Sequence, residues 1–413
     1  MERKKFLSGF LCGIALTLCL GTFLVYGNQL GWFDWLYQTS KGSEKITNAQ
    51  RRHALQKLGV LEKYIDKFYL NDLTADAYED GLYKGLISSL DDKYAAYYNK
   101  EEYESINAMN EGKYVGIGCS VTFDKETGVF TIIKPYEGSP ADEAGMKSGD
   151  ELVSVDGESI TGKNLSDVVA LIKGEEGTKV KVGVRRGSSN EILELEVTRK
   201  EVETKTVSYA MLENQIGYVA ISGFKDTTVN QFNEAIDALE KDNMKGLILD
   251  VRNNGGGALT AVVKMTDRLL KKGLIVYTRD KYGKGDDYYA EDKKELDLPM
   301  VLLVNENSAS ASEVFAGALK DHKMATLVGT RTYGKGIVQS IYSLSDGSAV
   351  KLTTSKYYTP NGYNIHEVGI EPDITVEMNK DYNATEDDIT EGPDLEKDNQ
   401  LQVAISCMKE KLK

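Results

Sequence analysis

The chain has 413 residues, enough for two or three domains that each bury a core of their own. Hydrophobic residues make up 41% and charged residues 28% of it, which excludes a fibrous or low-complexity protein. Acidic residues (64) outnumber basic ones (50), and the net charge of −14 excludes nucleic acid as a partner, because its phosphates would be repelled. The four cysteines form no CxxC pair, so neither a disulfide framework nor a cysteine metal site is predicted.

An apolar segment near the N-terminus is the first predicted element. A basic cluster at residues 3–5 precedes the uncharged run 6–26, whose 21 residues would span roughly 31 Å as a helix, about the thickness of a bilayer core. Trp32 and Trp35 follow where interfacial aromatic residues lie. We predict a retained transmembrane anchor over residues 1–34 in the cell membrane, with a cytoplasmic N-terminus and an extracytoplasmic body. A cleaved signal peptide is the alternative, although no A-x-A site follows the run.

Residues 45–111 have apolar side chains at three- and four-residue steps, as in Leu55, Leu58 and Leu61. This spacing is typical of amphipathic helices and predicts a small helical N-terminal domain.

Residues 112–200 differ in pattern, with short apolar alternations between glycine-rich turns, and this predicts a β-rich module. Segments 139–141 and 144–157 supply Ser-Pro-Ala, Ala-Gly-Met and Val-Asp-Gly motifs in a fixed order, which resembles a PDZ domain. The resemblance implies a groove for an extended C-terminal tail, closed by a carboxylate-binding loop. The loop residues implied are Tyr114, Val115, Gly116, Ile117 and Gly118.

From residue 201 to about 380 the pattern alternates between strands and helices, which predicts an α/β core. Two apolar runs, 246–251 and 300–304, indicate buried strands, and each continues into a loop of small polar residues. A strand that leads into such a turn and then a helix is where α/β enzymes place nucleophiles and anion sites. The chemistry is therefore predicted at these loops.

The candidate nucleophile lies in the serine-alanine run 308–312. A Ser-His-Asp triad would need His322 or His366, and neither histidine lies in a recognisable motif. A lysine can instead serve as general base where burial lowers its pKa from about 10.4 towards roughly 7 to 8. Lys335, set between two glycines, suits that role.

The run 308–313, together with residues 332–339, resembles the C-terminal processing peptidases, also called tail-specific proteases. In that family the middle serine is the nucleophile and a lysine follows 25 residues later, which implies Ser310 and Lys335. Gln339 is implied to orient the lysine amine. The resemblance extends from about residue 50 to the end of the chain. It implies a crotonase- or ClpP-like α/β core with an inserted PDZ domain, in a multi-domain protein that is α+β overall.

The reaction implied is acyl transfer through a covalent acyl-enzyme, as in a serine-type endopeptidase that needs no metal or organic cofactor. The family's D-L-R-N-N-P-G-G loop occurs here as residues 250–257, with valine and glycine in place of its leucine and proline. We expect the oxyanion to be held by the N–H of Ala311 and by the Gly255-Gly256 turn. Ser308 and Ser312 are the alternative nucleophiles.

Segments 350–360 and 369–373 also resemble the family, and we assign them to core strands and their exits rather than to catalysis. Residues 381–413 are predicted to form an acidic linker and a short amphipathic C-terminal helix, which packs on the body or contributes to a homodimer. The expected substrates are proteins or peptides with exposed C-termini. Two other functions remain open: an inactive membrane-anchored PDZ scaffold, and a crotonase-like acyl-CoA enzyme.

Overall fold

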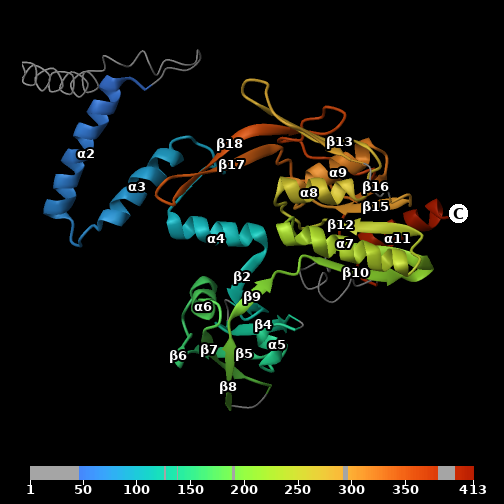
Figure 1. Cartoon of the computed structure of the whole chain (residues 1–413), viewed down its shortest axis with the longest axis horizontal. Coiled ribbons are helices and arrows are strands. Elements are labelled where there is room, and N and C mark those ends of the chain that lie inside the picture. The colour runs from blue at the N-terminus through green and yellow to red at the C-terminus, as the bar shows by residue number, and fades with distance from the viewer. Residues whose placement is uncertain (1–45, 125–126, 137, 188–190, 292–295, 380–395) are drawn as a thin grey trace, which may run out of the picture. The chain divides into compact units, whose positions relative to one another are not determined.

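The computed structural model of the protein describes residues 46–124, 127–136, 138–187, 191–291, 296–379 and 396–413 (Figure 1). These residues belong to two compact units, which divide between Leu82 and Tyr83. The predicted anchor, residues 1–34, lies outside the described residues, as do residues 380–395 of the predicted acidic linker. Within the described ranges, no helix combines the length and the apolarity needed to cross a bilayer.

The first unit contains helix α2 (Asn48–Phe68) and the start of α3 (Ala75–Ser88). Thr47 caps α2, because its hydroxyl accepts a hydrogen bond from the Gln50 N–H while the Gln50 side chain accepts one from the Thr47 N–H. The Tyr78 hydroxyl donates to Glu62 and ties α3 to α2. Both helices lie in the range where the apolar spacing predicts helices.

The remainder of the predicted helical domain includes a strand. Residues Ala96–Tyr98 form β1, which pairs with β18 (Ala349–Tyr358) from the far end of the chain. Helix α4 (Lys100–Glu111) follows and ends at Gly112, whose φ of 78° lies in the left-handed region. The part of this segment from Tyr83 onward thus belongs to the second unit, and the proposed domain boundary at residue 111 stays a prediction.

The β-rich module forms a sheet around a core that includes Phe130, Ile132 and Val182. Its strands occur in the order β3 (Cys119–Phe123), β4 (Phe130–Pro135), β5 (Glu151–Val155), β7 (Lys179–Arg185) and β8 (Ile192–Thr198), with β6 (Glu158–Ser159) beside β5. Its helices are α5 (Pro140–Glu143) and α6 (Leu165–Ile172). The chain enters through β2 (Lys113–Gly116) and leaves through β9 (Lys200–Glu203), and these two strands pair with each other.

A second, six-stranded sheet forms the core of the α/β part. Its order is β10 (Val207–Leu212), β11 (Ile216–Ile221), β12 (Gly246–Asp250), β15 (Met300–Val304), β16 (Ala325–Gly329) and β19 (Ile374–Thr375). Every pair is parallel except β10 with β11, which are joined by the short 3₁₀ turn η2 (Glu213–Gln215). Strands β11, β12 and β15 are buried throughout, as expected for a parallel sheet covered on both faces.

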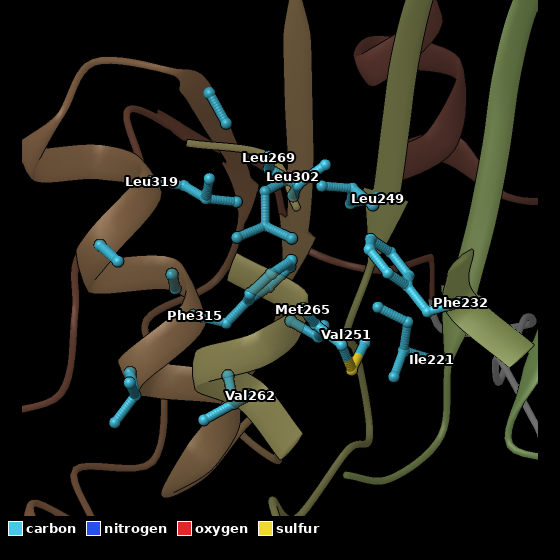
Figure 2. Close-up of a cluster of buried hydrophobic side chains, with 14 of the residues drawn as sticks. Ile221, Phe232, Leu249, Val251, Val262, Met265, Leu269, Leu302, Phe315 and Leu319 are labelled. Atoms are coloured by element: carbon cyan, nitrogen blue, oxygen red, sulfur yellow. The ribbon is translucent and has the colours of Figure 1, made fainter. Parts of the chain in front are cut away.

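Helices cover both faces of this sheet. The core cluster on one face joins Leu249, Val251 and Leu302 to Phe232 and Phe315 of the covering helices (Figure 2). Those helices are α7 (Asp226–Lys241), α8 (Leu259–Asp267) and α9 (Ala311–Asp321). The alternate residues of the strands pack on α11 (Asn399–Lys411), through Leu401, Ala404 and Met408.

A further sheet contains β18 as its central strand. Its order is β1, β18, β13 (Gly273–Asp280) and β14 (Asp287–Ala290), with β17 (Ile337–Ser343) also paired to β18. The assignment of 350–360 to a core strand is confirmed over most of its length, since β18 extends to Tyr358.

The topology explains where the site lies. Strands β12, β15 and β16 are parallel neighbours, so the loops that follow them emerge at the same edge of the sheet. These loops contain residues 251–257, 305–310 and 330–336, which include Ser310 and Lys335.

Candidate active site

Ser310 lies between β15 and the first turn of α9, in a strained backbone conformation. Its φ of 55° and ψ of −111° are rarely adopted by residues other than glycine. The side chain is nearly buried, with 7% of the residue exposed. Because Ser310 immediately precedes α9, the positive dipole end of that helix lies at the serine.

Glu313 joins the serine turn to the lysine loop. It is fully buried, and its Oε2 accepts hydrogen bonds from the N–H of Ser310 (2.9 Å) and of Lys335 (2.8 Å). Its Oε1 accepts from the N–H of Gly334 (2.7 Å) and from the Thr332 hydroxyl (2.6 Å). Hydrogen bonds to a buried carboxylate are strong, so this one side chain fixes Ser310 and Lys335 as neighbours in the fold.

Asn254 and Gly256 hold the 251–257 loop against the serine turn. The buried Asn254 accepts at its carbonyl from the Ala309 N–H (3.0 Å) and donates from its amide to Ile221 O (2.8 Å). A Cβ on Gly256 would lie 2.9 Å from Ser310 Cβ, so only glycine permits this approach. The Gly256 N–H donates to the Asn254 side chain at 2.8 Å.

The hydroxyls of the two alternative nucleophiles, Ser308 and Ser312, form hydrogen bonds to backbone carbonyls. Ser308 donates its hydroxyl to Val251 O and Ser312 to Asn254 O, each at 2.8 Å, and both residues are fully buried. These two hydroxyls hold the serine turn against the 251–257 loop by donating to its carbonyls, whereas the Ser310 hydroxyl forms no such bond to a carbonyl within the described residues.

Lys335 is half-buried, and its amine lies over the ring of Tyr94, 4.5 Å from the centroid. Burial lowers the pKa of Lys335 below its usual value, and the nearby ammonium groups of Lys351 and Lys93 lower it further. Among the described residues, no hydrogen bond joins the amine to Ser310. The amine is therefore electrostatically suited to act as a base, while it rests on an aromatic ring.

Gln339 lies on β17, four residues beyond Lys335, with its Nε2 3.5 Å from the Thr353 hydroxyl. The expected hydrogen bond between Gln339 and the lysine amine is not formed in this arrangement, and its role stays a prediction. His322 contacts Leu274 O through Nε2 (2.7 Å), at the C-terminal end of α9. His366 follows Ile365 in the segment beside Gly336, and neither histidine bonds to Ser310 within the described residues.

The PDZ-like loop residues Tyr114, Val115 and Gly116 belong to β2, and Ile117 and Gly118 connect it to β3. Strand β3 is the terminal strand of its sheet, so its outer edge has no partner strand among the described residues. The N–H groups of Ile117 and Gly118 likewise donate no hydrogen bond within the described part of the chain.

Besides Tyr94, three residues that sequence reasoning did not single out belong to the site. Glu313 and Asn254 lie inside the two motifs, and a buried polar role could have been suspected from a charged residue one turn into an apolar helix. Burial raises the pKa of Tyr357, on β18, to about 12, and the nearby Ser310 side chain offsets part of that rise. No signal in the sequence marks Tyr357, because only the folded sheets bring β18 to the serine.

The fold and the site together define a class, the serine peptidases that carry a PDZ module. The Peptidase family S41 matches residues 215–376 and the PDZ domain family matches residues 131–186. No group of three or more His, Cys, Asp or Glu side chains that could hold a metal ion occurs among the described residues.

Relatives define the family more narrowly. The carboxy-terminal processing protease CtpA of Bacillus subtilis is 38% identical over 323 residues, which are 78% of this chain and 69% of that protein. The chain belongs to the carboxy-terminal processing proteases of peptidase family S41, and it is a serine-type endopeptidase that acts on peptides or proteins. The prediction drawn from the serine-lysine motifs is thereby confirmed at the level of family and enzyme class.

Two solved structures are similar over most of the chain. A putative S41 protease from Bacteroides fragilis is 15% identical, with a TM-score of 0.50, over 79% of this chain and 90% of that one. The photosystem II D1 C-terminal processing protease is 32% identical, with a TM-score of 0.47, over 78% of this chain and 86% of that one. The first likeness concerns the fold alone.

Proposed function

We propose that this protease cleaves peptide bonds with Ser310 as nucleophile and Lys335 as general base. The observation that carries the proposal is the Glu313 carboxylate, which holds the N–H groups of both residues and so fixes their backbones side by side. The pKa of Lys335 is lowered, first by its burial, and this shift increases the neutral fraction of the amine that a general base requires.

The reaction follows from these groups. The neutral Lys335 amine, turned from Tyr94 towards the serine, takes the Ser310 proton as Oγ attacks the peptide carbonyl carbon. When the tetrahedral intermediate collapses, the C–N bond breaks and the lysine gives that proton to the leaving amine. Water then hydrolyses the ester, with the same amine as base. Gln339, on the strand after the lysine, is proposed to steer the amine once it has left Tyr94.

The oxyanion is proposed to accept hydrogen bonds from backbone N–H groups of the 251–257 loop and of the serine turn. The Ala311 N–H, at the start of α9, donates no hydrogen bond among the described residues, and the same is true of Gly255. Gly256 supports the site differently, since its own N–H is bonded to Asn254 and its missing side chain lets the loop approach Ser310. Donors of this kind stabilise the charge that develops in the transition state.

The substrate is proposed to enter through a pocket of about 1020 Å³ beside the lysine. Tyr94 and Ile337 line it, along with the loop 91–97 and the end of α3. A peptide chain in this pocket would compete with the lysine amine for the face of Tyr94. Substrate binding thus favours the turn of Lys335 towards Ser310.

The PDZ module is proposed to select substrates by an extended C-terminal tail. Support comes from the unpaired edge of β3 and from the free N–H groups of Ile117 and Gly118, which suit strand addition and carboxylate binding. Lys173 adds a positive charge, with its amine 5.2 Å from the centroid of the Tyr114 ring beside the same loop. Whether the module inhibits or activates cleavage is an outcome of the tests below.

We also propose an extracytoplasmic location, with the run 6–26 as a single-pass anchor in the cell membrane, a crotonase- or ClpP-like type for the core, and a homodimer. The basic cluster 3–5 and the length of the run support the anchor. Helix α2 has no buried residue and exposes Leu55 and Phe68, which supports a dimer contact. Membrane fractionation of the full chain and sedimentation of the detergent-solubilised protein test the anchor and the dimer.

The dyad is tested by cleavage of fluorescently labelled casein, an unfolded substrate, by the full chain and two variants. Ser310→Ala and Lys335→Ala should each lose at least about a thousandfold in rate while the melting temperature stays near that of the parent. Ser312→Ala is the matched control for the serine, and it should keep the chemistry. Cleavage by both dyad variants at the parental rate would overturn the mechanism, and an inactive parent would favour the PDZ scaffold.

The tail preference is tested with two peptides of the same sequence, one ending in a free carboxylate and one in an amide. Binding of the free acid should be tighter by about tenfold or more, and Lys173→Met should reduce that difference. The control is Lys179→Met, which removes a lysine from β7, three strands away from β3 in the module's sheet. Equal binding of acid and amide by the parent would contradict carboxylate recognition.

A further inference from the structure

His366 is part of the wall of the pocket through which the substrate is proposed to enter. It lines that pocket together with the loop 91–97 and with Ile337, which is the second residue after Lys335. The side chain of His366 is half-buried. An imidazole ring on this wall borders the space that a peptide would occupy on its way to the lysine.

Main-chain contacts fix the His366 segment against the lysine loop. The Glu367 N–H donates to Gly334 O at 2.8 Å, and a Cβ on Gly336 would overlap the main-chain nitrogen of His366, so only glycine permits this approach. The His366 N–H donates to the Asn364 side chain at 2.9 Å. Because the backbone on both sides of the ring is hydrogen-bonded, the imidazole is held at a fixed place beside the lysine loop.

The two ring nitrogens of His366 differ in their surroundings. Nδ1 is buried and has no hydrogen-bond partner among the described residues. Nε2 also forms no hydrogen bond within them, but it is not buried, so a ligand in the pocket can reach it. Buried N–H groups without a partner are rarer in proteins than buried acceptors without one. The neutral ring therefore carries its hydrogen on Nε2, where a ligand can accept it.

Other polar groups of the same pocket already have partners. Asp92 accepts a hydrogen bond from the Tyr94 N–H at 2.9 Å, and Lys84 forms an ion pair with Glu102 at 2.8 Å. The Nε2–H of His366 is, by contrast, a donor that is available to a ligand. In a peptide the acceptor that recurs at every residue is the main-chain carbonyl oxygen, so this is the group that suits the donor.

We propose that His366 positions the substrate by donating a hydrogen bond from Nε2 to a main-chain carbonyl oxygen of the peptide, an inference that rests on the proposed entry of the substrate through this pocket. The histidine takes no part in proton transfer. Its bond forms in the enzyme–substrate complex and persists in the transition state, so its loss should raise KM and leave kcat unchanged. A hydrogen bond between neutral groups corresponds to a change of about three- to tenfold.

Steady-state cleavage of an internally quenched peptide by the full chain tests the proposal, with the peptide amidated so that no terminal carboxylate contributes. His366→Gln places an amide N–H close to the position of Nε2, whereas His366→Asn places it close to Nδ1. We expect KM to rise about three- to tenfold for His366→Asn and to stay near that of the parent for His366→Gln, with kcat unchanged in both. His53→Asn, the same change at an exposed histidine of α2, should match the parent.

Thioamide peptides identify the bond itself. Sulfur is a weaker acceptor than oxygen, so a thioamide at the carbonyl that binds His366 should raise KM for the parent and have no such effect on His366→Asn. Thioamide effects that are equal in parent and variant at every position, or a parental KM for His366→Asn, would overturn the role of His366. Where His366→Asn fails to fold, His366→Phe serves as the variant without a donor.

Two further variants separate this proposal from those on which it rests. Ala95→Trp places a large ring in the pocket, since Ala95 is part of its lining. A raised KM for Ala95→Trp with a parental KM for His366→Asn would overturn only the role of His366. An unchanged KM for Ala95→Trp would overturn entry through the pocket, and with it the role of His366. Cleavage by Ser310→Ala at the parental rate would overturn the serine-lysine mechanism instead.

Discussion

At Glu313, one buried carboxylate accepts hydrogen bonds from Ser310, Thr332, Gly334 and Lys335, so a single side chain reaches both halves of the site. Glu313→Gln would turn an amide NH₂ towards donors that need an acceptor. Each buried donor left without a partner costs about 1–3 kcal/mol. We expect a lower melting temperature by calorimetry and at least a tenfold lower kcat.

The control for Glu313 is Glu306→Gln, the same chemical change at an exposed residue that accepts from the Thr330 hydroxyl. It should change the free energy of unfolding by less than about 0.5 kcal/mol. Equal effects at the two positions would show that the four hydrogen bonds to Glu313 do not hold the site together.

The charge on Lys351 is predicted to set part of the pH range of the enzyme. After burial, the Lys351 ammonium is the strongest influence that lowers the pKa of Lys335. Lys351→Met should therefore raise the pKa of Lys335, so that less of the amine is neutral at pH 7. The acidic limb of the kcat/KM profile should move to higher pH, with a lower rate at neutral pH.

The matched variant for Lys351 is Lys356→Met, another lysine of β18, which lines the pocket and has no resolved influence on Lys335. The midpoint of its acidic limb should coincide with that of the parent. A shift of the Lys351→Met limb to lower pH would contradict the assignment of Lys335 as the base.

At the scale of elements, the C-terminal helix α11 is fastened to the sheet by a buried ionic cluster. Arg252, directly after β12, binds Asp250 and Asp398, each at 2.6 Å, and Asp398 caps α11 through the Leu401 N–H. Arg252→Met would leave two buried carboxylates without their partner. Such a loss costs about 3–5 kcal/mol, which urea denaturation should show directly.

The comparison for Arg252 is Arg268→Met, because Arg268 binds the more exposed carboxylates of Asp237 and Glu240. That loss should be below about 1 kcal/mol. If the two variants unfold at the same urea concentration, α11 does not depend on the buried cluster.

At the scale of the whole molecule, the PDZ module is inserted through one pair of strands. Lys113 and Glu203 are opposite each other in the β2–β9 ladder, so the chain leaves and rejoins the protease part at the same place. A two-residue Asn-Gly turn between them should close the gap without strain. We expect residues 114–202 to be removable with the protease part still folded, as judged by circular dichroism and a cooperative thermal transition.

The shortened protein also reveals what the module does. It should cleave acid-ended and amide-ended substrates alike, and its rate on a short internal peptide should rise if the module inhibits the site or fall if it activates it. If the shortened protein still prefers substrates with a free carboxylate, the C-terminal tail is recognised outside the PDZ module.

The sequence predicts those parts of the fold and the site that depend on neighbouring residues in the chain, and it misses contacts between residues that are far apart in the chain. The strands around 246–251 and 300–304, the serine turn and the lysine loop all carry local patterns, and they were predicted from those patterns. The positions of Tyr94, whose ring lies under the Lys335 amine, and of Tyr357, whose N–H donates to Gly336 O, were not, because pairing between strands remote in sequence brings them there. No local pattern records which face of a distant strand meets a given loop.

The backbone of Ser310 has a consequence for the evolution of the enzyme. Its φ and ψ match those of the first central position of a type II′ turn, where glycine is the preferred residue. Ser310→Gly should therefore melt at a higher temperature than Ser310→Ala, although both lack the hydroxyl. If Ser310 is the nucleophile, as proposed, catalysis requires at this position a residue that the backbone conformation disfavours, and an inactive variant with glycine there should gain heat resistance.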